Sequence, residues 1–110
     1  MRKEFTLARD ADAQRLYDLI LQASNELLYN CKHYRIELLR RHSPSYKEIA
    51  VAMRELSGII TVLADDFDPM MGQKAFEYCE LMSGIGVAIE RFEEVRLLRL
   101  VAELERRPGL

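Results

Sequence analysis

Apolar side chains recur at intervals of three and four residues along most of the chain, the spacing that places them on one face of an α-helix. The first set begins at Leu16 and continues through Ile20, Ala23, Leu27, Cys31, Tyr34 and Leu38. A second set occupies residues 46–67 and a third residues 75–95. The pattern predicts an all-α fold.

Proline-containing segments separate the three periodic sets. A residue that precedes proline is driven out of the helical conformation, so the first helix should end by Ser43. Ser45 and Glu48 have the spacing of a capping box, and Asp68 followed by Pro69 is typical of a helix start. We therefore predict one domain over residues 1–110, with helices at about 10–41, 45–67 and 69–107.

The middle helix carries apolar side chains beyond its main stripe, namely Val51, Ala52, Ile59 and Val62. A helix that is apolar on most sides is usually covered on most sides, so we expect it to be central in an antiparallel three-helix bundle. The outer helices are longer than this central one, and we expect dimerisation into a larger bundle to cover the excess.

The end of the third predicted helix carries two apolar stripes rather than one. Phe92, Val95 and Leu98 continue the main stripe, and Leu97, Val101 and Leu104 form a second one. This arc is wider than one neighbouring helix needs. We therefore expect a surface for self-association or for a partner helix, carried by Leu97, Leu98, Val101 and Leu104.

Two similar tetrapeptides occur in the middle and third helices, Leu56-Ser57-Gly58-Ile59 and Met82-Ser83-Gly84-Ile85. Small residues let two helix backbones approach each other closely, whereas glycine inside a helix costs about 1 kcal/mol relative to alanine. Gly84 and Gly86 together therefore predict a close helix crossing or a bend.

The net charge of −2 does not favour a general phosphate-binding surface, so we expect no nucleic acid partner. The N-terminus lacks the apolar core of a signal peptide, and the longest uncharged stretch, residues 81–89, is too short to span a membrane. We expect a cytoplasmic protein with Cys31 and Cys79 as buried free thiols.

Candidate metal ligands are sparse. His33 and Glu37 share a helix face, but two ligands do not make a site. The acidic turn formed by Asp65, Asp66 and Asp68 lacks the spacing of a calcium loop. We expect no metal, no cofactor and no enzymatic activity.

Arg35 and His42 are seven residues apart, which matches the Arg-x(4–6)-His pattern of HEPN-type ribonucleases. The resemblance implies that the pair handles phosphate charge and proton transfer. The polar residue that commonly accompanies the arginine is replaced here by Tyr34. A ribonuclease is therefore an alternative to an interaction module.

The segment Ser43-Pro44-Ser45-Tyr46-Lys47-Glu48-Ile49-Ala50 resembles the entry to a helix-turn-helix in repressors of the LexA type. Such a motif next requires a turn, where this chain has Arg54 and Glu55 within an unbroken apolar period. A small transcriptional regulator is a second alternative.

The run Ala23-Ser24-Asn25-Glu26-Leu27-Leu28-Tyr29 resembles the Ala-Ser…Leu-Tyr segment of the flagellar export chaperones of the FliS type. Residues 52–63 and Phe76-Glu77-Tyr78 fall in comparable places on later helices. The similarity implies a secretion-chaperone-like protein that holds a partner helix. Our principal expectation is thus a non-enzymatic helical interaction module.

Overall fold

A computed structural model describes residues 2–64 and 69–107, and within these ranges the ordered elements are five α-helices. Their bounds are α1 Arg2–His33, α2 Ile36–Arg41, α3 Ser43–Ala64, α4 Pro69–Glu90 and α5 Glu94–Arg106. The all-α class is therefore as predicted. The acidic turn and the expected cap at Asp68 lie outside the described residues, as does the side chain of Ser45.

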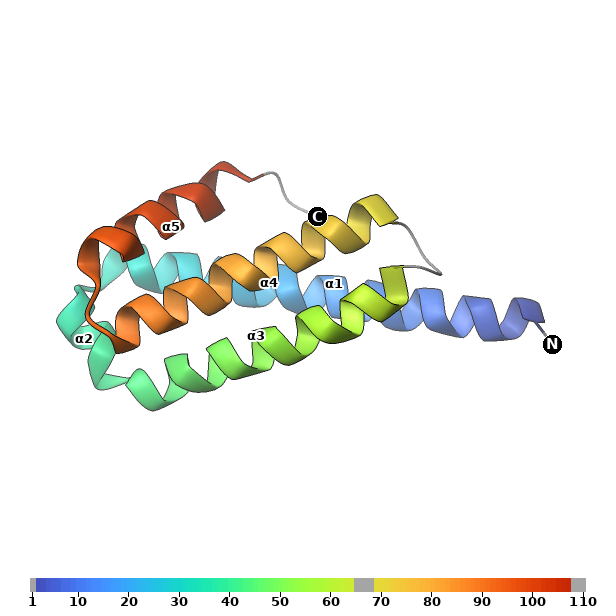
Figure 1. Cartoon of the computed structure of the whole chain (residues 1–110), viewed down its shortest axis with the longest axis horizontal. Coiled ribbons are helices and arrows are strands. Elements are labelled where there is room, and N and C mark those ends of the chain that lie inside the picture. The colour runs from blue at the N-terminus through green and yellow to red at the C-terminus, as the bar shows by residue number, and fades with distance from the viewer. Residues whose placement is uncertain (1, 65–68, 108–110) are drawn as a thin grey trace.

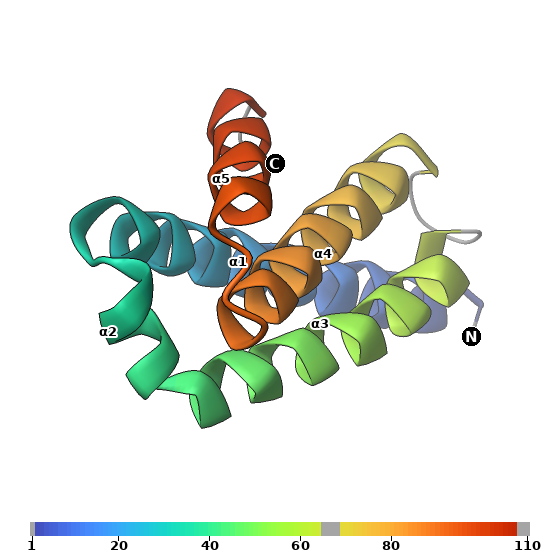
Figure 2. The same cartoon turned by 60° about the vertical axis from the view of Figure 1, so that its left-hand side comes forward.

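The long helices lie roughly side by side, with α1 and α4 running in one direction and α3 and α5 in the other (Figure 1). The hairpin of α3 and α4 has the most extensive helix contact in the molecule. Helix α5 lies beside α4 and beside the C-terminal half of α1, and the short α2 crosses the end of the bundle (Figure 2). The molecule is elongated, 53 × 26 × 17 Å.

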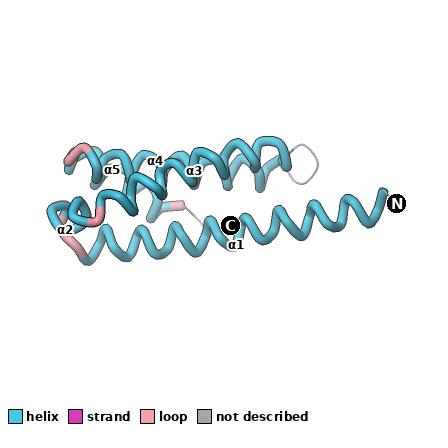
Figure 3. The backbone as a smooth tube through the Cα atoms, turned by 90° about the horizontal axis from the view of Figure 1, so that it is seen from below, coloured by secondary structure: helices cyan, strands magenta, loops and turns pink. Residues whose placement is uncertain are grey.

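Helix α1 is the longest element, with 32 residues. At about 1.5 Å per residue it is about 48 Å long, whereas the 22-residue helices α3 and α4 are about 33 Å long. The N-terminal part of α1 therefore extends past the α3–α4 hairpin (Figure 3).

The predicted 10–41 helix is divided into α1 and α2. Tyr34 N–H still bonds to Asn30 O at 2.9 Å, but Arg35 adopts an extended conformation (φ −70°, ψ 156°) and the chain turns. The turn brings Ile36 and Leu39 of α2 into the core, where they are buried. A straight helix would have carried these two side chains past the end of α4.

The predicted 69–107 helix is likewise divided, between α4 and α5. Phe92 has φ 59°, in the left-handed region, and its N–H bonds to Ile89 O at 3.2 Å. Glu93 N–H bonds to Ala88 O at 2.8 Å. These two bonds form a Schellman motif, the usual end of a helix, with phenylalanine in the position that glycine normally occupies.

The central helix is α4, which packs against each of the other four described helices. The prediction that the 45–67 helix is central was wrong, because one face of α3 is turned to solvent. The core lies between α4 and its neighbours. Its fully buried side chains include Ile20, Leu39, Cys79, Met82, Ile85 and Ile89.

Candidate functional site

The four residues expected to bind a partner on α5 do not share one surface. Leu97 and Leu104 are 4% and 3% exposed and pack into the protein's own core, and Val101 is partly buried against it. Leu98 is 63% exposed, next to Val95 at 84%. The outward apolar surface of α5 is therefore narrow, because half of the predicted arc covers α4 and α1.

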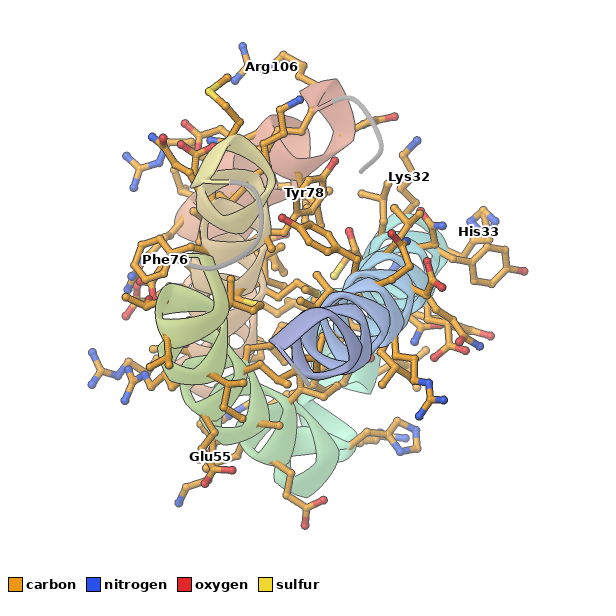
Figure 4. The ribbon with its side chains drawn as sticks, turned by 90° about the vertical axis from the view of Figure 1, so that its right-hand side faces the viewer. Lys32, His33, Glu55, Phe76, Tyr78 and Arg106 are labelled. Carbon is orange, nitrogen blue, oxygen red and sulfur yellow. The ribbon has the colours of Figure 1, made fainter. Side chains whose placement is uncertain are left out.

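A second exposed apolar surface lies on α3. Val51, Ile59 and Val62 are 51%, 48% and 65% exposed. With Gly58 they occupy the side of α3 opposite its buried residues, and we call these four residues the outer face of α3. Glu55 lies between them along the helix and points away from the bundle (Figure 4).

Gly58 has open space where a side chain would be, since, apart from its own chain neighbours and helix backbone, no atom of the described residues lies within 4 Å of a Cβ built there. Gly86 of α4 is the opposite case, because its Cβ would come within 2.7 Å of the backbone oxygen of Tyr46. Gly86 thus permits α3 and α4 to touch, as the sequence predicted. Gly58 serves no contact within the described protomer.

Charged side chains of both signs flank the outer face of α3. Lys47, Glu48, Arg54 and Glu55 are all exposed. A shallow depression of about 500 Å³ follows this side of the helix, with Val51 and Ala52 between the charged residues that line it. A second copy of this face would therefore meet opposite as well as like charges.

The sequence showed the extra apolar residues of this helix, and we predicted that they would be buried in the protein's own core. The signal for the surface was the same pattern, an apolar content larger than one neighbour requires. Which side stays uncovered is not encoded in the periodicity.

A cavity of about 430 Å³ lies at the corner where α1, α2 and the start of α3 meet. Its lining combines aliphatic side chains with aromatic and amide groups, namely Asn30, Tyr34, Leu38, Leu39, His42, Tyr46 and Ile49. The turn at Arg35 creates this corner, because it brings α2 across the end of the bundle.

Tyr46 is the buried polar group of this cavity, at 6% exposure. Burial raises the pKa of the Tyr46 hydroxyl, and a hydrogen bond with the Asn30 side chain opposes part of that rise. The hydroxyl therefore stays protonated at neutral pH and remains available as a hydrogen-bond donor.

Arg35 and His42 lie at the two ends of α2, as its N-terminal and C-terminal flanking residues. His42 lines the cavity, and Arg35 is outside its lining. The ribonuclease pairing stays a hypothesis. Helix α3 runs unbroken from Ser43 to Ala64, so it lacks the turn that a helix-turn-helix requires near Arg54.

The two cysteines are free thiols in surroundings that disfavour ionisation. Burial raises the pKa of Cys31 to about 11 and that of Cys79 to about 12. Because the thiolate is the nucleophilic and metal-binding form, neither thiol is activated at neutral pH. Across the described residues, no three His, Cys, Asp or Glu side chains are grouped as metal ligands would be.

Two ion pairs connect α5 to its neighbours. Lys32 of α1 pairs with Glu105, and Arg107, directly after α5, pairs with Glu77 of α4. Both pairs lie partly in solvent and contribute little to stability. They link the short α5 to the two longer helices α1 and α4.

Helices of the described part of the chain are all too short or too polar to cross a membrane. No protein-family model, curated protein or solved structure matches this chain.

Proposed function

We propose that this protein is a non-enzymatic helical interaction module that self-associates through the outer face of α3. The observation that carries the proposal is the exposure of three large aliphatic side chains, Val51, Ile59 and Val62, on one side of one helix. Exposed aliphatic side chains gathered on one side of a helix are a feature of protein–protein contact sites.

The energy available from this face is moderate. Burying a half-exposed valine or isoleucine contributes about 1 kcal/mol, and a symmetric pair would bury three such side chains from each copy. Association itself costs several kcal/mol of translational and rotational freedom. A micromolar dimer requires about 8 kcal/mol, which is more than these six side chains supply, so we expect a reversible dimer with a dissociation constant in the millimolar range.

Gly58 supports the same surface independently. A glycine inside a helix costs about 1 kcal/mol relative to alanine, and here an added Cβ would meet nothing within 4 Å. The described protomer thus provides no packing reason for glycine at this position. Close approach of a second helix backbone would provide one.

The test is sedimentation equilibrium of the purified protein from the micromolar into the millimolar range, with Val62→Glu as the disrupting variant. A carboxylate in an apolar contact is costly unless it is paired, so we expect the dissociation constant to rise at least about tenfold. Val95→Glu is the matched control, because Val95 is even more exposed but lies on α5. It should associate like the parent protein.

A parent protein that stays monomeric at millimolar concentration would contradict self-association. Dissociation by Val95→Glu alone would move the contact to α5. In the alternative form of the proposal, the same face holds a helix of another protein. The parent would then be monomeric, and Val62→Glu would release a helical partner that co-purifies with the parent.

A further inference from the structure

We propose that the cavity at the α1–α2–α3 corner is a binding site for a small aromatic carboxylate. The inference is independent of the α3 surface, because the cavity lies at the end of the bundle and shares none of the residues of the outer face of α3. It rests on the size of the cavity, its polar groups and the charges beside it.

The volume of about 430 Å³ is within the range of small-molecule pockets, about 300 to 1,000 Å³. A cavity of about 150 Å³ holds benzene, so this one admits one or two fused rings that carry a carboxylate. Leu38, Leu39 and Ile49 supply the apolar wall for such rings.

Two large side chains of the lining remain half in water. Tyr34 is 49% exposed and Leu38 is 44% exposed. A planar ring placed between them would remove apolar surface from water and could stack on the tyrosine. The rim therefore favours an aromatic ligand over a compact polar one.

The polar groups of the lining suit a carboxylate because they can donate hydrogen bonds. The Tyr46 hydroxyl is protonated and hydrogen-bonds with the Asn30 amide, so the two groups bring O–H and N–H donors to the cavity. His42 and Tyr34 contribute a ring N–H and a second hydroxyl from other elements. Among the described residues, none of the lining side chains is a carboxylate.

The chain around the cavity carries more positive than negative charge, which suits an anionic ligand. Residues 30–49, the stretch that supplies the lining, contain five Lys or Arg and two carboxylates, Glu37 and Glu48, in a chain whose net charge is −2. Lys32 is engaged by Glu105, and Arg40 lies over the Phe92 ring at 5.2 Å. An excess of cations along this stretch raises the local concentration of an anion.

The experiment is a titration of ¹⁵N-labelled protein with 2-naphthoate, followed by amide chemical shifts at low salt. We expect saturable shifts confined to the end of α1, α2 and the start of α3. The neutral analogue 2-naphthalenemethanol tests whether binding requires the carboxylate, and octanoate tests whether it requires an aromatic ring. Each should bind at least fivefold more weakly than 2-naphthoate.

Leu38→Glu is the disrupting variant, because Leu38 is partly exposed and the change places a negative charge at the rim. We expect at least tenfold weaker naphthoate binding. Leu19→Glu is the matched control, since Leu19 is also an exposed leucine but lies on α1 outside the cavity. It should bind naphthoate like the parent protein.

Tyr46→Phe keeps the ring and removes the hydroxyl, and it should weaken naphthoate binding about fivefold and binding of the neutral analogue by less, because a hydrogen bond to a carboxylate is stronger than one to an alcohol. The proposal is overturned by an absence of saturable shifts, by shifts centred elsewhere, or by equal losses in Leu38→Glu and Leu19→Glu. Equal or tighter binding of either analogue would overturn the assigned ligand class.

Discussion

Helices α3 and α4 have the same length, 22 residues, and both are predominantly apolar, yet α4 packs against all four other described helices whereas α3 leaves one face in solvent. Helix α4 carries small residues on several sides, with Gly72, Ala75, Ser83 and Ala88 all buried. Helix α3 directs its small buried residues, Ala50 and Ser57, toward one side. Small side chains let neighbours approach, so their distribution around a helix decides how many neighbours it acquires.

The two similar tetrapeptides show the same difference at the level of single residues. Ser57 and Ser83 are buried in both helices, but Ile59 is 48% exposed and Ile85 is 0% exposed. A Cβ on Gly84 would contact Leu100 of α5 at 3.2 Å, whereas one on Gly58 would contact nothing. Nearly identical local sequence thus occupies a sealed site in α4 and a surface site in α3.

The largest expected effect comes from truncating the matched isoleucines. Ile85→Ala should lower the free energy of unfolding by about 3 kcal/mol, because it removes buried methyl groups and leaves a cavity in the core. Ile59→Ala should lower it by less than about 1 kcal/mol in the monomer. Urea denaturation at low protein concentration measures both. Equal losses would show that α3 and α4 are buried alike.

A slightly smaller effect is expected at the glycine contact between the two helices. Gly86→Ala places a methyl group 2.7 Å from the Tyr46 backbone oxygen and 3.2 Å from the Ala50 Cβ, so α3 and α4 must move apart. We expect a loss of about 2 kcal/mol in the free energy of unfolding.

Gly58→Ala is the control for that experiment and has the opposite predicted sign. With open space at this position, the helix propensity of alanine should stabilise the monomer by up to about 1 kcal/mol. A destabilised Gly58→Ala monomer, or a neutral Gly86→Ala, would reverse the assignment of which glycine serves the fold.

The last comparison tests how well α4 is sealed; it has no effect at neutral pH and appears only at high pH. The buried Cys79 thiol has its pKa raised from about 9 to about 12. Its contribution to stability is fully present below pH 9 and decreases as pH rises from 9 through 12, by at most about 1.4 kcal/mol per pH unit. Cys79→Ala should show a flatter decline over that range in urea denaturation. Parallel pH profiles would mean that water reaches the thiol.

Several structural features could be read directly from the residues. The three-and-four spacing of apolar side chains predicted helices because each satisfies its own backbone and buries one stripe. Pro44 marked the start of a new helix and Pro69 the first residue of α4, since proline restricts its own backbone and that of its predecessor. The close contact at Gly84 and Gly86 was also predictable from residue size alone.

The two additional helix breaks were not predictable, because neither contains glycine or proline. Arg35 becomes extended so that Ile36 and Leu39 can reach the core. Phe92 adopts a left-handed conformation that costs about 1 kcal/mol, and packing of α5 against α4 and α1 must offset that cost. Contacts between segments that are distant in the chain determine where such unfavourable local conformations occur.

For the candidate sites, too, some features were predictable from the sequence and others depend on tertiary packing. Sequence identified the apolar excess on α3 and on the last helix, and it identified His42 as a residue of interest. Only tertiary packing turned Leu97 inward and left Leu98 and Val62 outside, and only the turn before α2 assembled the corner cavity. Periodicity determines that a helix has an apolar face, because that depends on residues three and four apart. Which faces meet depends on side-chain volumes across different helices, and that is settled only when the helices pack.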